Sequence, residues 1–164
     1  MPDFVVSGTD GFDASIDALL ASINTQTEIA MSLGAETIVR STRLQFGGQH
    51  AAGTARTIKG PRPQSISENL KNSVSVVDSP NQVAPGQWKA RVAPTMIYSR
   101  IMEKGGTIYP KNASMLSWVG PGGKRIFARS VTLPPRPYLG PGVEKSKEAI
   151  SVIFRERWAQ ALIS

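Results

Sequence analysis

Two apolar stripes at helical spacing, one near each end of the chain, limit what this sequence can fold into. In both stripes apolar or small residues recur every three or four positions, the period at which side chains share one face of an α-helix. The first stripe is made of Phe12, Ile16, Leu19, Leu20 and Ile23. The second is made of Val143, Ser146, Ala149, Ile150, Ile153, Phe154, Trp158, Ala161 and Leu162. The pattern predicts a long first helix, which ends near residue 44, and a C-terminal helix.

The segment between the two stripes changes to the pattern of strands. Residues 74–77 and 88–92 alternate apolar with polar side chains, as half-buried strands do. Turn-forming residues cluster between them at residues 78–81 and 85–86, so these two strands are expected to pair as an antiparallel hairpin. Residues 115–119 and 125–129 flank a second Gly/Pro cluster and predict a second hairpin.

These elements indicate one α+β domain over residues 1–164. We expect a long N-terminal helix, a curled antiparallel sheet of about four to five strands, and a C-terminal helix packed on that sheet. Residues 45–66 are rich in Gly, Pro and Ala and follow no period, which predicts a long flexible loop. Residues 109–131 are expected to form a hairpin insert.

Shorter patterns predict the remaining elements. Residues 4–6 indicate an edge strand, residues 67–71 one helical turn, and residues 95–104 a helical face. Gly105 and Gly106 end that face, because glycine readily adopts the positive φ that reverses the chain after a helix. The prolines of residues 134–137 predict a stiff extended crossing before the final helix.

The net charge of +7 conceals two segments of opposite sign. Residues 1–39 carry six acidic residues and no Lys or Arg, whereas residues 40–164 carry all 19 basic residues and six acidic ones. Such asymmetry is typical of nucleic-acid binding. It is equally typical of identical subunits that meet head to tail, or of a solvated basic surface. Composition leaves these three interpretations open.

The residue types that catalysis and metal binding require are scarce. The chain has no cysteine and one histidine, His50, which stands in the Gly/Ala-rich loop with no acid within ten positions. Lys124 follows a glycine cluster but precedes Arg125 rather than Ser or Thr, so it does not complete a phosphate loop. We therefore expect no enzyme, cofactor or metal. There is also no apolar run near the ~20 residues that a membrane helix needs.

Seven basic side chains are candidates for contact with DNA or with a partner protein. They are Arg56, Lys59, Arg62, Lys111, Lys124, Arg125 and Arg129. A β-ribbon with Trp118 and Phe127 among basic residues is able to follow a phosphate backbone. Without a recognisable nucleic-acid motif, however, the favoured interpretation is a strand whose apolar side chains face the core while its basic ones point outward.

Two blocks of sequence carry a resemblance to a known family. The first contains Tyr98, Glu103, Gly105 and Gly106, and the second contains Pro134, Arg136, Pro137 and Leu139. They resemble the Tyr-Ala-x-x-x-Glu-x-Gly-(Gly/Thr) and Pro-x-Arg-Pro-Phe-Leu blocks of tailed-bacteriophage tail-completion and head–tail joining proteins, also called the virion morphogenesis family. Ser99 replaces the usual Ala and Tyr138 the usual Phe. The segment 109–131 varies in that family, so nothing carries over to it.

The resemblance implies a structural virion protein that forms a homo-oligomeric ring, expected to be a hexamer, in the neck or at the top of the tail. Such a ring completes the tail and joins it to the head. Its expected partners are copies of itself and the adjacent terminator, tube or head-completion ring, with non-specific contact to DNA in the lumen. The protein would be made in the cytoplasm of a bacterial host. The alternative is a small basic nucleic-acid-binding protein outside any virion.

Glu103 is the only acidic residue of the first block, and Arg136 is the only charged residue of the second. If the blocks meet, Glu103 is expected either to cap a chain segment or to form a charge-assisted bond with Arg136, within one subunit or between two. Two solvated surface charges are the alternative, and the sequence leaves these interpretations open.

Overall fold

The first apolar stripe forms a single long helix, α1 (Thr9–Arg43). The structure is a computed structural model that describes residues 9–47, 63 and 68–163. Arg40 and Arg43 lie in the last turn of α1, where cations complement the helix dipole. Arg43 also ties the helix end to the next elements, because its Nη2 donates to the Val74 carbonyl at 2.8 Å. The long N-terminal helix is confirmed.

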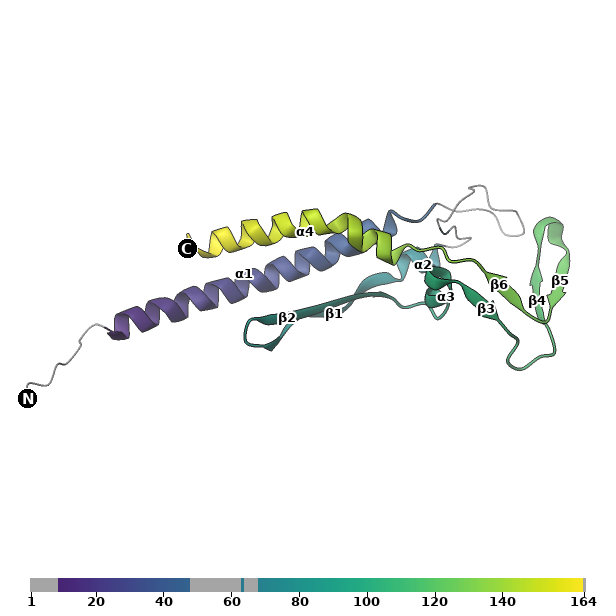
Figure 1. The fold of residues 1–164 in the computed structure, drawn as a ribbon, viewed down its shortest axis with the longest axis horizontal. Coiled ribbons are helices and arrows are strands. Elements are labelled where there is room, and N and C mark those ends of the chain that lie inside the picture. Colours follow the sequence, from purple (N-terminus) through teal and green to yellow (C-terminus); the bar gives the residue numbers. More distant parts are fainter. Residues whose placement is uncertain (1–8, 48–62, 64–67, 164) are drawn as a thin grey trace, which may run out of the picture.

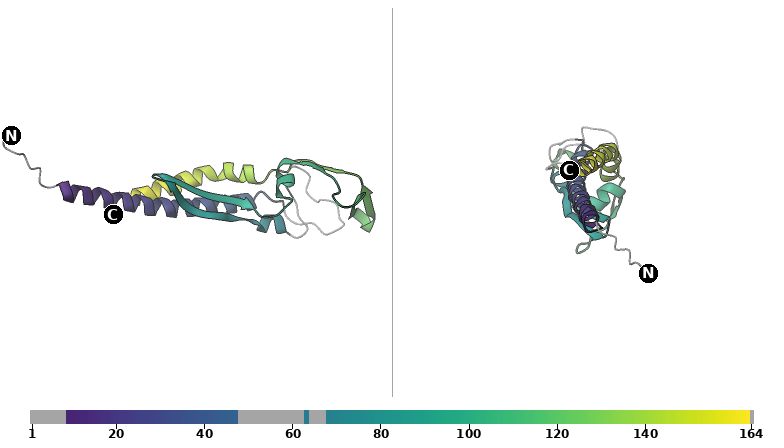
Figure 2. Two further views of the ribbon diagram at one scale, coloured as in Figure 1. Left: turned by 90° about the horizontal axis from the view of Figure 1, so that it is seen from below. Right: turned by 90° about the vertical axis from the view of Figure 1, so that its left-hand side faces the viewer.

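The second stripe forms α4 (Leu139–Ala161), which lies along α1 for most of its length (Figures 1 and 2). The Trp158 indole N–H donates to Thr27 Oγ1 at 3.0 Å across the two helices. The C-terminal helix was expected to pack on the sheet, but α1 is its main neighbour. Periodicity identifies which face of a helix is apolar and not which element covers it, so this part of the expectation needs correction.

The first hairpin pairs β1 (Val74–Ala84) with β2 (Gln87–Pro94) and packs against α1. The strands are longer than expected and the turn is confined to Pro85 and Gly86, which has φ 71°. The predicted turn at residues 78–81 is wrong. That segment, with Pro80, belongs to β1, where register shifts interrupt the ladder. A proline fits a strand at such an irregularity because it has no N–H to donate.

The remaining elements are short. Those that were predicted follow the expected order, and β6 was not among them. The helical turn and the face that ends at Gly105 are both present, although the latter begins later than expected. Their bounds are α2 (Asn69–Asn72), α3 (Ser99–Lys104), β3 (Gly106–Ile108), β4 (Leu116–Val119), η1 (Pro121–Gly123), β5 (Arg125–Ala128) and β6 (Val131–Leu133). The second hairpin, β4 with β5, is confirmed.

The α+β class is confirmed, but the strands do not join into the single curled sheet that was expected. Among the described residues they form three separate two-stranded antiparallel ladders, β1–β2, β3–β6 and β4–β5. The alternating pattern of a strand is satisfied by one partner strand and one covered face. It therefore carries little information about how many strands join.

The core of the described residues is small and lies where α1, α2, β1 and the start of α4 meet. Its buried members are Val39, Leu70, Val74 and Tyr138. By contrast, Phe12, Ile16 and Leu20 of the first stripe are exposed. No described helix is both long and apolar enough to cross a membrane. The predicted strand at residues 4–6, most of the loop 45–66 and His50 lie outside the described residues.

Candidate assembly site

The two sequence blocks, separated by the 26 residues 107–132, meet in one place, called here the motif junction (residues 98–106 and 133–140). Its centre is the Glu103 carboxylate at the end of α3. Oε2 accepts the backbone N–H groups of Tyr138 at 2.7 Å and Leu139 at 3.0 Å, and Oε1 accepts that of Gly140 at 3.0 Å. Glu103 therefore caps α4, which is the first of its two expected roles.

This cap completes the hydrogen bonding of the first turn of α4. The first four N–H groups of a helix have no partner within the helix. Three of these groups are bonded to Glu103, and the fourth position is Pro141, which has no N–H. The N-cap residue, Tyr138, supplies no side-chain cap of its own. The ion pairs between described residues do not include one from Glu103 to Arg136.

Backbone contacts also hold the two blocks together. The Arg136 N–H donates to the Met102 carbonyl at 2.8 Å, and Gly106 pairs with Leu133 at the start of the β3–β6 ladder. Gly105 has φ 71°, and a Cβ there would lie 2.8 Å from the nitrogen of Pro135. Both the positive φ and the close approach require glycine at this position. Gly105 thus has a structural reason to stand in the motif.

The other motif residues lie around this contact. Tyr98 is partly exposed at the start of α3, and Leu139 packs against the core. Pro134 and Pro137 are exposed in the extended crossing, whereas Arg136 is half-buried. The junction contains no nucleophile beside a base. It is an arrangement that fixes backbone geometry and holds α4 in place.

Tyr138 links the junction to the core. Its ring lies 4.8 Å from that of Phe46, centroid to centroid, and its hydroxyl donates to the Ser99 carbonyl at 3.3 Å. The side chain is almost fully buried. Burial, and next the nearby Glu103 carboxylate, raise the pKa of the Tyr138 hydroxyl from 10.0 to about 12.

This shift predicts a loss of stability in alkaline solution. Between pH 10 and 12 the unfolded chain releases the Tyr138 proton while the folded protein retains it, so the free energy of unfolding falls as pH rises. The fall should reach at most about 3 kcal/mol. Tyr138→Phe removes the titrating group, so in urea unfolding from pH 9 to 12 it should lose stability less steeply than the wild type. Equal alkaline slopes for both proteins would contradict the assignment.

The candidate contact cations divide between described and undescribed residues. Lys111, Lys124, Arg125 and Arg129 are all exposed, on or beside the β4–β5 hairpin, whereas Arg56, Lys59 and Arg62 lie outside the described residues. The hairpin stands at one end of the molecule, away from the core (Figure 1). The favoured interpretation placed its apolar side chains against the core, and that interpretation is wrong. Phe127 is 60% exposed.

The opposite end of the molecule is the start of α1. The last helical residue of α4, Ala161, lies beside Ser22 of α1. Residues 9–21 of α1 therefore extend beyond α4, and residues 11–18 are all exposed (Figure 1). Asp13 and Asp17 stand on this segment beside the exposed apolar row. The elongated shape thus has an acidic apolar end and a basic apolar end.

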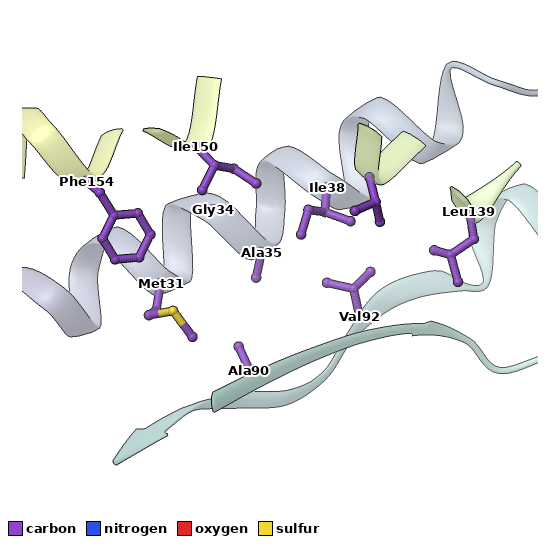
Figure 3. Close-up of a pocket in the computed structure, with 10 residues that line it drawn as sticks. Met31, Gly34, Ala35, Ile38, Ala90, Val92, Leu139, Ile150 and Phe154 are labelled. Atoms are coloured by element: carbon purple, nitrogen blue, oxygen red, sulfur yellow. The ribbon is translucent and has the colours of Figure 1, made fainter. Parts of the chain in front are cut away.

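An apolar recess of about 240 Å³ opens between α1, α4 and β2 (Figure 3). It is lined by Met31, Gly34, Ala35, Ile38, Ala90, Val92, Leu139, Val143, Ile150 and Phe154. None of these side chains carries a titratable group, so the recess offers nothing that could transfer a proton. Elsewhere in the described part of the chain, no three His, Cys, Asp or Glu side chains gather where they would hold a metal ion.

Sequence reasoning missed Gly142, where α4 approaches α1 closely. A Cβ there would lie 2.6 Å from Thr42 Cα. A signal existed, because a glycine inside a helical pattern often marks a close approach of backbones.

Comparisons of the chain with family models, with curated proteins and with solved structures found no match.

Proposed function

We propose that this protein is a structural subunit of a tailed-phage virion that assembles with copies of itself into a ring at the neck or at the top of the tail. The observation that carries the proposal is the motif junction. The two blocks that resemble the tail-completion family are distant in sequence, yet Glu103 of the first caps the helix that begins at the end of the second. If the two resemblances were accidental, there would be no reason for the two blocks to lie in contact.

The surface supports work done by interfaces rather than by chemistry. Large apolar side chains are exposed at both ends of the described molecule, including Phe12, Leu20, Val119 and Phe127. Such surfaces are typical of subunits that are covered in an assembly. In this proposal a six-fold ring joins tail to head and contacts the adjacent terminator, tube or head-completion ring. Its basic residues contact DNA in the lumen without reading sequence.

The test is the mass of the purified protein in solution at low and high salt, with and without duplex DNA, followed by electron microscopy of any assembly. A closed ring that persists at high salt is the expected result, because apolar packing is not screened by ions. A protein that stays monomeric and binds DNA tightly in every preparation would overturn the proposal.

The second candidate function is non-specific nucleic-acid binding outside any virion. The exposed cluster of Lys124, Arg125 and Phe127 favours it, because cations hold phosphates and an aromatic ring stacks on bases. The salt dependence separates the two functions. A DNA binder that neutralises several phosphates loses affinity by orders of magnitude as salt rises from 50 to 200 mM, in proportion to the phosphates contacted.

A further inference from the structure

The first thirteen residues of α1 carry an apolar row that nothing in the described molecule covers. Phe12, Ile16 and Leu20 are spaced by four residues and form this row, and Phe12 is 66% exposed. Asp13 and Asp17 run directly beside it with the same spacing. Residues 9–21, called here the acidic tip, project about 20 Å beyond α4 at 1.5 Å per residue.

The projecting segment lacks the packing that stabilises most helices. It continues from the packed part of α1 and so needs no nucleus of its own, but most helical stability in proteins comes from packing of an apolar face. The acids in its first turns favour the helix through the dipole, but that effect is worth only about 1 kcal/mol or less per residue. The apolar row remains unexplained until something covers it.

The β4–β5 hairpin offers a matching surface at the other end of the molecule. The pairs Ser117↔Phe127 and Val119↔Arg125 share one side of the ladder, called here the outer face. Phe127 and Val119 are 60% and 56% exposed, so two apolar side chains lie beside the Arg125 cation. Lys124, in the adjoining turn, is exposed as well.

We propose that the acidic tip of one copy docks on the outer face of the β4–β5 hairpin of the next copy. Phe12, Ile16 and Leu20 cover Val119 and Phe127, and the Asp13 and Asp17 carboxylates face the cations of Lys124 and Arg125. The two surfaces complement each other in both apolar area and charge. The inference rests on the self-assembly in the proposed function and names the contact that produces it.

The position of the two surfaces explains why the partner is a second copy. They lie at opposite ends of an elongated molecule and cannot meet within one chain (Figures 1 and 2). A contact between different patches of identical subunits is heterologous, and it closes into a ring when the rotation allows. DNA would account for the cations of the hairpin. It would repel the acidic tip and leave the apolar row uncovered.

The absence of cysteine in the chain allows a direct test by disulfide trapping. Ser15→Cys lies beside the apolar row of the tip, and Ser117→Cys lies on the outer face; both serines are exposed. The two single variants are mixed under oxidising conditions and the yield of covalent dimer is measured. Ser151→Cys, an exposed position on α4, is the matched control when mixed with Ser117→Cys. A disulfide requires Cα atoms within about 7 Å, so it reports a real approach.

We expect the tip–hairpin pair to form dimer at least about tenfold faster than the control pair, and faster at low salt. Adding Asp13→Lys and Asp17→Lys to the tip variant should reduce the yield to the control level. Adding Lys124→Glu and Arg125→Glu to the hairpin variant should do the same. Mixing the two charge-reversed variants with each other should restore it, which excludes simple unfolding as the cause. Helical content by circular dichroism accompanies each variant.

A tip–hairpin yield equal to that of the control pair overturns the inference. The inference is also overturned if reversing the hairpin charges abolishes DNA binding but leaves the yield of covalent dimer unchanged, because the hairpin is then a DNA site. The failure of the proposed function is distinct. If the cysteine-free protein forms rings but no dimer is trapped, the proposed function stands and the inferred contact is wrong. If a dimer is trapped but the protein forms only open filaments, the contact is correct and the ring is contradicted.

Discussion

Replacing Gly142 by alanine is expected to lower the free energy of unfolding by about 2–3 kcal/mol. Gly142 is buried where α4 crosses α1, and a Cβ at this position would lie 2.6 Å from Thr42 Cα. Because the obstacle includes the backbone of Thr42 as well as its side chain, the two helices would have to move apart. The gain in helix propensity from Gly to Ala, about 1 kcal/mol, is too small to offset this. Chemical denaturation monitored by circular dichroism measures the change.

Gly34→Ala is the matched control on the same helix pair. There the new Cβ would meet the Ile150 side chain at 3.6 Å, an ordinary contact at the edge of the apolar recess. This variant should gain up to about 1 kcal/mol from helix propensity. Thr42→Ala should not rescue Gly142→Ala, since it removes only the side chain. A neutral Gly142→Ala, or a rescue by Thr42→Ala, would show that the helices adapt.

Local patterns predicted the elements well because local physics forms them. The stripes that begin at Phe12 and end at Leu162 produced helices, and the Gly-rich cluster after Val119 produced a hairpin turn. The wrong turn at residues 78–81 has a similar origin. Asp, Ser, Pro and Asn favour turns, but pairing with β2 carried the chain through Pro80 as an irregular strand. Tertiary pairing overrode a local preference.

The partners of the elements were harder to predict. An apolar face must be covered, but neither the stripe of α4 nor that of α1 states by what. The favoured interpretation that the apolar side chains of the second hairpin face the core failed at Phe127, and Phe12 of the first stripe is exposed as well. Sequence periodicity cannot distinguish a side chain buried within one chain from one that a second chain covers.

The candidate site was predictable in part. Glu103 and Gly105 were identified from the blocks, and a cap was one of the two roles expected for Glu103. The sequence could not choose between the cap and a pair with Arg136, because the choice depends on where the start of α4 falls in space. Gly142 carried the signal of a glycine within a helical pattern, but no pattern connects it with its partner Thr42, a hundred residues earlier.

Replacing Glu103 by alanine is expected to destabilise the protein by about 3 kcal/mol. The carboxylate accepts three backbone N–H groups at 2.7–3.0 Å, and those of Tyr138 and Leu139 are partly buried. Removing it leaves these donors without a partner and removes a negative charge from the positive end of a 23-residue helix. Urea denaturation at neutral pH measures the loss.

Glu103→Gln separates charge from geometry. The amide retains one acceptor oxygen but presents an NH₂ group to the remaining N–H donors, so about half of the loss, ~1.5–2 kcal/mol, is expected. Glu148→Gln, at an exposed acid in the middle of α4, removes the same charge and should change stability by less than about 0.5 kcal/mol. If Glu103→Gln and Glu148→Gln behave alike, the cap contributes no more than a surface charge.

Because of where the cap lies, its loss is expected to affect assembly as well as stability. Glu103 fixes the start of α4 to α3, and the β3–β6 ladder continues directly from both blocks toward the β4–β5 hairpin. A frayed α4 would release the orientation of the hairpin relative to α1. Glu103→Gln should therefore reduce ring formation at temperatures where the protein is still folded, measured as assembled mass against circular dichroism. Unchanged assembly in a destabilised but folded variant would show that the junction supports the fold alone.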